Sequence, residues 1–159
     1  MKNLMASFAL TCAALSAGTC LAQTVAAAPA TSNASAYPVA AAPGLYQAFG
    51  ELQGLRTLMD DFVQRLKADA RIGDQFRNTS AERLSQLLTL QLCQLSGGPC
   101  TYEGRDMKAA HAGMNISKAH FNALVEVLQD TMNARGIPFA RQNQMLALLA
   151  PMYRDMVAP

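Results

Sequence analysis

A single histidine lies on the apolar face of a short predicted helix near residue 110 of this 159-residue chain. Met107, Ala110, His111 and Met114 recur at positions i, i+3, i+4 and i+7, so their side chains share one face. A histidine that faces an apolar space is either a hydrogen-bonded core residue or a ligand, because neutral imidazole serves in both roles. These residues alone favour the core role for His111. The choice between core residue and ligand depends on the other motifs of the chain.

Length and charge limit the classes of function. The 159 residues are enough for one domain with a substantial core. Lys and Arg total 13 and Asp and Glu total 11, which gives a net charge of +2 at pH 7. This balance lacks the basic surface that binds DNA, RNA or anionic membranes, so no nucleic-acid partner is expected.

Residues 1–22 have the pattern of a secretory signal peptide. Lys2 precedes an apolar stretch over residues 4–15, and Cys20-Leu21-Ala22 offers a small-x-small cleavage site. The stretch is shorter than the roughly 20 apolar residues that span a bilayer, so the mature chain should have no stable membrane span. Cleavage predicts a periplasmic protein. A lipoprotein acylated at Cys20 is the weaker alternative, because the Leu that usually stands three residues earlier is missing.

Residues 23–43 are rich in Ala, Pro, Ser and Thr, contain no charge and show no periodicity. Pro29, Pro38 and Pro43 interrupt any helix there. We therefore expect a disordered linker, followed by a folded domain over residues 44–159.

Apolar residues recur with helical spacing from Leu45 onward, and no segment alternates with a period of two. The apolar faces run over residues 55–66, 84–95, 121–132 and 145–152. The sequence therefore predicts an all-α domain with four principal helices and a short helix that carries His111. Such faces can close as a simple bundle or enclose a flat apolar cofactor, and periodicity does not distinguish the two.

Four local signals set the helix boundaries. Thr79 and Glu82 have the spacing of a capping box, which predicts that a helix begins there. Gly97-Gly98-Pro99 should end that helix, and Ser117 is a candidate N-cap for the next one. Pro151 should kink or end the last helix.

The ordered motifs from Leu45 to Val157 resemble the group I truncated haemoglobins. In chain order they are Leu45-Tyr46-Gln47-Ala48-Phe49-Gly50, Asp60-Asp61-Phe62, Phe76, Gly97-Gly98-Pro99, Tyr102, Gly104, Met107, His111-Ala112-Gly113-Met114, His120-Phe121 and Leu149-Ala150-Pro151. Each motif is weak by itself, whereas the ordered set is specific. The resemblance implies a truncated globin, a two-over-two helical sandwich around non-covalent haem b.

The resemblance implies that His111 is the proximal ligand of the haem iron. A coordinating imidazole uses one nitrogen while the other N–H is held by an acceptor, and the Met107 carbonyl lies one turn earlier. His120 is the second histidine, and we expect a structural or surface role for it. Covalent haem attachment is not expected, because the chain has no Cys-x-x-Cys-His run.

The resemblance also implies further haem contacts. Thr79, Arg83 and Tyr102 match positions near the propionates, and Arg83 can pair with a carboxylate, although a solvated helix charge explains it equally well. The implied wall residues are Phe76, Leu84, Leu87, Leu88, Leu92, Met107, Ile116, Phe121, Leu124, Val125 and Leu149. Ordinary core packing applies to each of these as well.

The chain departs from the family on the distal side. Members that retain O₂ have a tyrosine on the second helix and polar residues on the third, and here the matching positions are Val63, Leu84 and Leu88. Bound O₂ carries partial negative charge, so a pocket without a donor predicts weak O₂ retention and fast autoxidation. Binding of CO and NO depends less on such a donor and should persist.

Two cysteines remain after the predicted leader. Cys93 and Cys100 lie seven residues apart across the end of a predicted helix, and in an exported protein this spacing favours a disulfide over two free thiols. A zinc site is not expected, since no second thiol pair is present.

Three functions remain open. The leading one is an exported haem protein that binds a diatomic gas (O₂, NO or CO) through His111, with an electron donor as a further candidate partner. The second is an enzyme, an NO dioxygenase or weak peroxidase that uses the same haem; the aliphatic distal residues argue against it. The third is a haem-free helical interaction protein.

Overall fold

The computed structural model of this chain describes residues 39–157. The predicted signal peptide and most of the predicted linker lie outside this range. In chain order the elements are α1 (Leu45–Ala48), α2 (Glu51–Ala68), the 3₁₀ turn η2 (Gly73–Phe76), α3 (Ala81–Leu95), α4 (Met107–His111), α5 (Lys118–Ala134), α6 (Phe139–Leu149), the 3₁₀ turn η3 (Ala150–Met152) and α7 (Tyr153–Met156). The all-α prediction is therefore confirmed.

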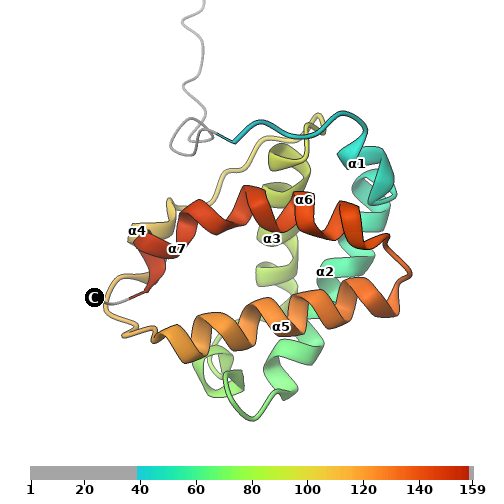
Figure 1. Ribbon diagram of the computed structural model, residues 1–159. Helices are drawn as coiled ribbons and strands as arrows, with labels where there is room; N and C mark the ends of the chain where they lie inside the picture. The colour runs from blue at the N-terminus through green and yellow to red at the C-terminus, as the bar shows by residue number, and fades with distance from the viewer. Residues whose placement is uncertain (1–38, 158–159) are drawn as a thin grey trace, which may run out of the picture. The chain divides into compact units, whose positions relative to one another are not determined.

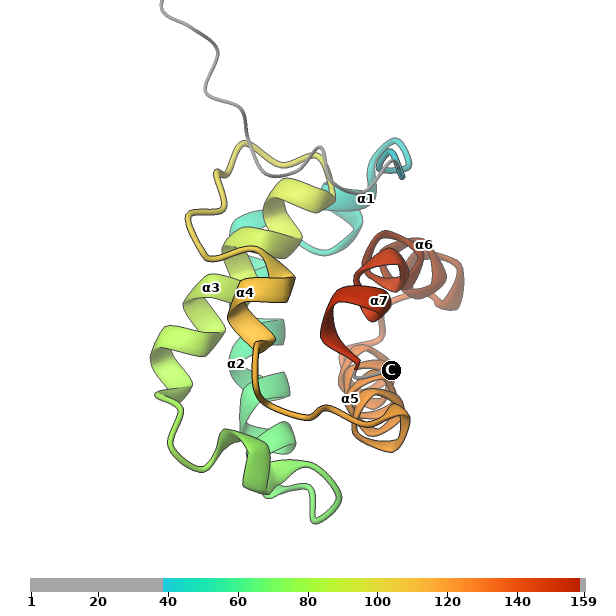
Figure 2. The same cartoon turned by 90° about the vertical axis from the view of Figure 1, so that its left-hand side faces the viewer.

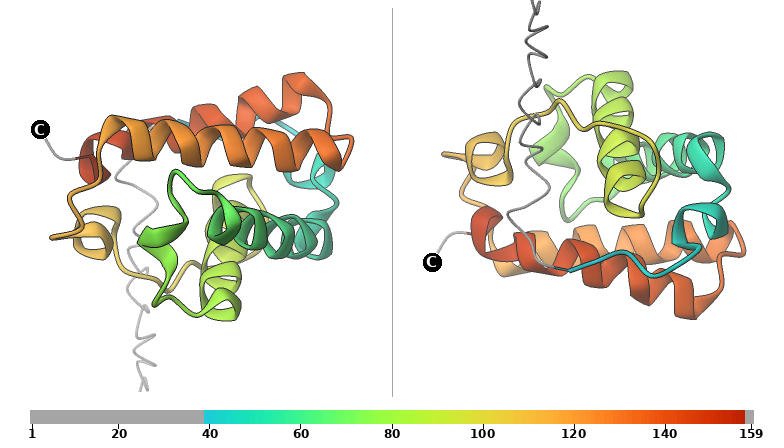
Figure 3. Two further views of the ribbon diagram at one scale, coloured as in Figure 1. Left: turned by 90° about the horizontal axis from the view of Figure 1, so that it is seen from below. Right: turned by 90° about the horizontal axis from the view of Figure 1, so that it is seen from above.

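The four long helices form two antiparallel pairs in two layers. Helix α2 runs beside α3 in one layer, and α5 runs beside α6 in the other (Figure 1). Seen along the layers, the α5–α6 pair lies over the α2–α3 pair (Figure 3). This arrangement is the two-over-two helical sandwich that the resemblance to the group I truncated haemoglobins implied.

Helix α2 buries the apolar face that its periodicity predicted. The buried residues are Leu55, Leu58, Met59, Phe62, Val63 and Leu66. The helix begins at Glu51, four residues before that face, and continues through Gly54. A Cβ at Gly54 would lie 2.1 Å from the Phe49 carbonyl oxygen, so glycine permits the close approach of α1 to α2.

Three of the predicted helix boundaries are reproduced and one is displaced. The N-cap of α3 is Ser80, whose hydroxyl accepts from the Arg83 amide, whereas the capping box placed the start at Thr79. Ser117 caps α5, and the ring of His120 completes its capping box. Helix α6 ends at Leu149, and Pro151 lies in the 3₁₀ turn that follows. His120 therefore has the structural role that we expected.

Helices α4 and α7 lie side by side at one end of the two layers (Figure 2). An isolated parallel bridge joins Ile116, in the segment between α4 and α5, to Val157 just after α7. The C-terminal segment therefore packs beside the helix that carries His111. None of the helices in the described range has the length and apolarity needed to cross a membrane.

Candidate functional site

His111 lies at the C-terminal end of α4, a helix of one and a half turns whose N-cap is Asp106. Its Nδ1 lies 2.8 Å from the Met107 carbonyl oxygen. A carbonyl can only accept, so Nδ1 carries a proton, and in the neutral ring the lone pair is then on Nε2. The side chain is half-buried and lines a cavity. His111 therefore presents an oriented imidazole whose neutral form would bind a metal ion through Nε2.

The cavity has a volume of about 310 Å³ and lies between the two helix layers. Its lining is apolar except for the amide of Gln91 and the imidazole of His111. The lining residues are Met59, Phe62, Leu66, Phe76, Leu84, Leu88, Gln91, Leu92, Met107, His111, Phe121, Leu124, Val125, Leu128, Leu146, Leu149, Ala150, Met152 and Met156. A hydrocarbon cavity with one basic nitrogen suits a flat apolar ligand that coordinates through a metal.

The structure brings ten of the predicted site residues together at this cavity. They are Phe76, Leu84, Leu88, Leu92, Met107, His111, Phe121, Leu124, Val125 and Leu149. Six others lie outside the lining: Val63, Thr79, Arg83, Leu87, Tyr102 and Ile116. The residues that gather come from α3, α4, α5 and α6 and from η2, so no single segment builds the site.

The residues outside the lining have other surroundings. Val63 is 1% exposed in the core, one helical turn from the cavity-lining Met59. Arg83 is exposed, and its guanidinium lies 3.3 Å from the Gln86 side-chain oxygen. The Thr79 carbonyl accepts from Lys67 at 2.6 Å. In these contacts the polar residues serve local structure at the start of α3.

Tyr102 lies in the loop between α3 and α4. Its amide donates to the Gln94 side-chain oxygen at 2.5 Å, and its hydroxyl donates to the Arg105 carbonyl at 3.0 Å. Burial of the phenol raises its pKa above the ordinary value of 10.0. The ring packs against Gly104, where an added Cβ would lie 2.2 Å from it. The phenol is therefore held by its own loop.

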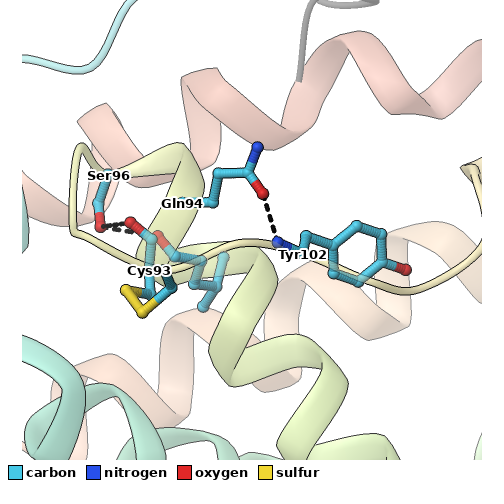
Figure 4. The surroundings of a disulfide bond; sticks show 6 residues. Cys93, Gln94, Ser96 and Tyr102 are labelled. Atoms are coloured by element: carbon cyan, nitrogen blue, oxygen red, sulfur yellow. Dashed lines mark hydrogen bonds between the residues drawn. A yellow bond between two sulfur atoms is a disulfide. The ribbon is translucent and has the colours of Figure 1, made fainter. Parts of the chain in front are cut away.

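A disulfide joins Cys93, in α3, to Cys100, in the loop that also carries Tyr102 (Figure 4). Their Cα atoms are 5.7 Å apart. Cys93 is in the last two turns of α3 and is 0% exposed. A Cβ at Gly98 would lie 2.7 Å from the Cys93 sulfur, so the turn between the cysteines requires a residue without a side chain. The disulfide ties the start of this loop to the end of α3.

Lys67 holds the segment that carries Phe76. Its ammonium donates to the carbonyl oxygens of Phe76, at 2.9 Å, and Thr79, at 2.6 Å. Both contacts are partly buried, and they join the end of α2 to the end of η2. Phe76 itself lines the cavity, so this lysine positions one aromatic wall of the site.

Sequence reasoning missed one polar residue of the cavity. Gln91 is 7% exposed and lines the cavity from α3. Gln91 lies seven residues after Leu84 and three after Leu88, so these side chains share one helix face, and this spacing was the available signal. Met152 and Met156 were also missed as site residues. Met152 ends the last predicted apolar face, and nothing in that spacing distinguishes a cavity residue from a core residue.

The donor set fits haem. His111 offers one nitrogen to the cavity, and the described residues contain no group of three or more His, Cys, Asp or Glu side chains that could hold a bare metal ion. An apolar cavity with one imidazole would hold haem, because the porphyrin supplies the other ligands of the iron.

Comparisons with known proteins agree with this geometry. A sequence model of the bacterial-like globin family matches residues 44–158. A group 1 truncated haemoglobin from Tetrahymena pyriformis is 30% identical over 113 residues, which cover 71% of this chain and 93% of the relative. One from Mycolicibacterium paratuberculosis is 29% identical over 108 residues, which cover 68% and 79%.

Solved structures show the same likeness. The ferric truncated haemoglobin of Tetrahymena pyriformis superposes with a TM-score of 0.69 at 30% identity, covering 72% of this chain and 98% of the other. A 2/2 haemoglobin from Synechococcus, solved in the cyanomet state with covalently attached haem, gives a TM-score of 0.67 at 22% identity over 71% and 97%. That second likeness concerns the fold alone. The chain therefore belongs to the bacterial-like globin family and is a group I truncated globin, a haem-binding globin with a two-over-two helical fold.

Proposed function

We propose that this globin binds diatomic gases at the iron of a non-covalent haem b that is ligated by His111. The observation that carries the proposal is the contact between His111 Nδ1 and the Met107 carbonyl at 2.8 Å, which leaves Nε2 as the ligating atom at the cavity. When bound, the haem iron would supply the position at which a gas coordinates, and His111 would hold the iron.

The residues of the chain orient the cofactor and exclude water. Phe76 and Phe121 offer aromatic faces to a flat ring, and the leucines on α3 and α5 supply the remaining apolar contacts. Non-covalent binding is supported by the cysteines, since Cys93 and Cys100 are paired with each other. Arg83, exposed at the start of α3, is our candidate for pairing with a propionate.

The character of the cavity supports selection against O₂. Leu84 and Leu88 line it with hydrocarbon, and Val63 brings no polar group. The Gln91 amide, the polar donor of the lining, is directed to the sulfurs of Met107 and Met152. Without a donor at Val63, Leu84 or Leu88, O₂ should dissociate quickly and the ferrous iron should autoxidise, whereas CO and NO should be retained. The physiological ligand would then be NO, or O₂ bound weakly.

We also propose that the protein acts outside the cytoplasm, in a bacterial periplasm. Residues 1–22, which lie outside the described range, carry the pattern of a cleaved signal peptide. Cys93 and Cys100 form a pair that persists in an oxidising compartment, and this supports the same location.

The test is an absorption spectrum of the purified protein in the ferric, reduced and CO-bound states, recorded beside His111→Ala and His120→Ala variants. We expect a Soret band with one haem per chain and a five-coordinate ferrous form that binds CO. His111→Ala should change the ferrous spectrum, and His120→Ala should keep it, because His120 caps α5 and does not line the cavity.

Two outcomes would contradict the proposal. A protein that gains no Soret band after reconstitution with haem is not a gas-binding globin. A His111→Ala variant with an unchanged ferrous spectrum would show that another residue ligates the iron. The folding of each variant is checked by its helical circular dichroism.

A further inference from the structure

The carboxamide of Gln91 makes an unusual contact inside the cavity. Its Nε2 lies 3.6 Å from the Met107 sulfur and 3.7 Å from the Met152 sulfur. The three side chains are 7%, 8% and 4% exposed, and all three line the cavity. The amide therefore joins α3, the first residue of α4 and the last residue of η3.

These two contacts satisfy the amide poorly. A thioether sulfur is a weak acceptor, and burying an amide without a good partner is unfavourable. The same nitrogen would gain a much stronger partner if either sulfur carried an oxygen atom, because a sulfoxide oxygen is a strong acceptor. The site is therefore better matched to an oxidised methionine than to the reduced one.

We propose that Met107 and Met152 form an oxidation site for hydrogen peroxide, with Gln91 as the residue that stabilises the product. The sulfur lone pair attacks one peroxide oxygen, a sulfur–oxygen bond forms and the O–O bond breaks. The sulfur is oxidised by two electrons, and the other oxygen takes up the peroxide proton and leaves as water. The new oxygen accepts from the Gln91 amide, and methionine sulfoxide reductases can reverse the change.

Oxidation of Met107 would affect His111, the proposed ligand of the haem iron. Met107 provides the carbonyl that orients His111, so a polar sulfoxide on its side chain alters the wall next to that imidazole. This consequence rests on the proposed haem function, whereas the oxidation site itself does not. Peroxide would thereby change how firmly the cavity holds its cofactor.

The other methionines of the chain provide internal controls. Met59 and the half-buried Met156 line the same cavity, and among the described residues neither accepts a hydrogen bond from Gln91. Met132 and Met145 are 0% exposed in the core and do not line the cavity. The oxidation rate of Met156 therefore measures how readily peroxide enters the cavity where no amide assists. The rates of Met132 and Met145 measure how much oxidation follows unfolding of the core.

The experiment treats the purified protein with graded hydrogen peroxide and measures sulfoxide at each methionine by peptide mass spectrometry. Wild type, Gln91→Leu and Gln91→Asn are compared at equal haem content, set by reconstitution, so that iron-catalysed oxidation contributes equally. Gln91→Leu removes the amide, and Gln91→Asn keeps the amide but shortens the side chain by one methylene.

The amide would already donate to the oxygen while the sulfur–oxygen bond forms. We therefore expect Met107 and Met152 to be oxidised about fivefold faster than Met59 in the wild type, the factor that one ordinary hydrogen bond contributes. Both variants should lose that advantage while the rate at Met156 stays the same. Equal rates at Met59, Met107 and Met152 in the wild type would overturn the proposal without any variant. Unchanged rates at Met107 and Met152 in folded Gln91→Leu would overturn it too.

Discussion

The imidazole Nδ1 of His111 is held by the carbonyl oxygen of Met107 at 2.8 Å, across one turn of α4. This contact selects the tautomer with a free Nε2 and limits rotation of the ring. Because Met107 also lines the cavity, the residue that orients the imidazole also forms part of the cavity wall.

A donor placed on α3 should strengthen retention of O₂. Leu88 lines the cavity, and Leu88→Gln would add an amide there. We expect O₂ dissociation and autoxidation to slow by about tenfold, because a hydrogen bond to partially charged O₂ contributes on the order of 1.4 kcal/mol. Stopped-flow kinetics measure both rates. Leu88→Met is the matched apolar control, and equal rates in all three proteins would refute the apolar-pocket explanation.

Removal of the Lys67 ammonium should loosen the wall formed by Phe76. Lys67→Met deletes two hydrogen bonds to carbonyl oxygens, and we expect the free energy of unfolding to fall by about 1–2 kcal/mol. Haem transfer to an acceptor apoprotein should become faster as Phe76 gains freedom. The control is Lys118→Met, which removes the same charge from an exposed position. A Lys67→Met protein that matches this control would show that the two contacts do not position Phe76.

The disulfide should stabilise the domain by lowering the conformational entropy of the unfolded chain. In the chain-entropy description, closing the loop from Cys93 to Cys100 contributes about 2–3 kcal/mol. A thiol reductant should therefore lower the Tm of the wild type. The Tm of the double variant Cys93→Ser and Cys100→Ser should be low with or without reductant. If reductant leaves the wild-type Tm unchanged although the thiols are shown to be free, this contribution is absent.

The phenol of Tyr102 should lose its proton at a higher pH than that of an ordinary tyrosine. Burial disfavours its phenolate and raises the pKa above 10.0, so the neutral form is favoured in the folded state. Its contribution to stability is therefore complete below pH of about 10 and is lost as the pH rises further, toward the folded-state pKa. Phenolate absorbance measured in wild type and Tyr102→Phe gives the titration of this residue by difference. A difference curve centred at the ordinary value would contradict the burial of the phenol.

Local pattern was sufficient to place the helices and to predict the buried face of α2. The set Leu55, Leu58, Met59, Phe62, Val63 and Leu66 is buried as its spacing predicted, because a 3.6-residue period fixes which side chains share a face. On α3 the predicted buried face was wrong except for Leu92, because Leu84 and Leu88 line the cavity and the buried residues there include Ser85, Thr89, Gln91 and Cys93. The cap of α3 was displaced by one residue, since Thr79 and Ser80 are both good capping residues. The N-cap residue has an extended backbone, and the packing of the preceding turn decides which of the two residues adopts it.

The order of the motifs predicted the globin fold and the place of His111, because these motifs occur once each and in a specific sequence. The chain alone could not reveal that Tyr102 and Arg83 lie outside the cavity lining. Both side chains are long, so their spacing along the chain does not fix where they end. The loop from Gly97 to Asp106 has no periodicity, and the position of Tyr102 is decided by its contacts with Gln94 and Arg105.

Sequence by itself determined the helices and the buried face of α2, since these follow from short-range spacing along the chain. The role of His111 came from the resemblance to a family, because spacing alone favoured a core residue there. Tertiary structure decided that Gln91, Met107 and Met152 meet, because they come from three elements separated by up to 61 residues. Hydrophobic periodicity predicts that such residues are buried but carries no information about which of them touch. The chemistry of the cavity therefore depends on packing between helices that no local pattern specifies.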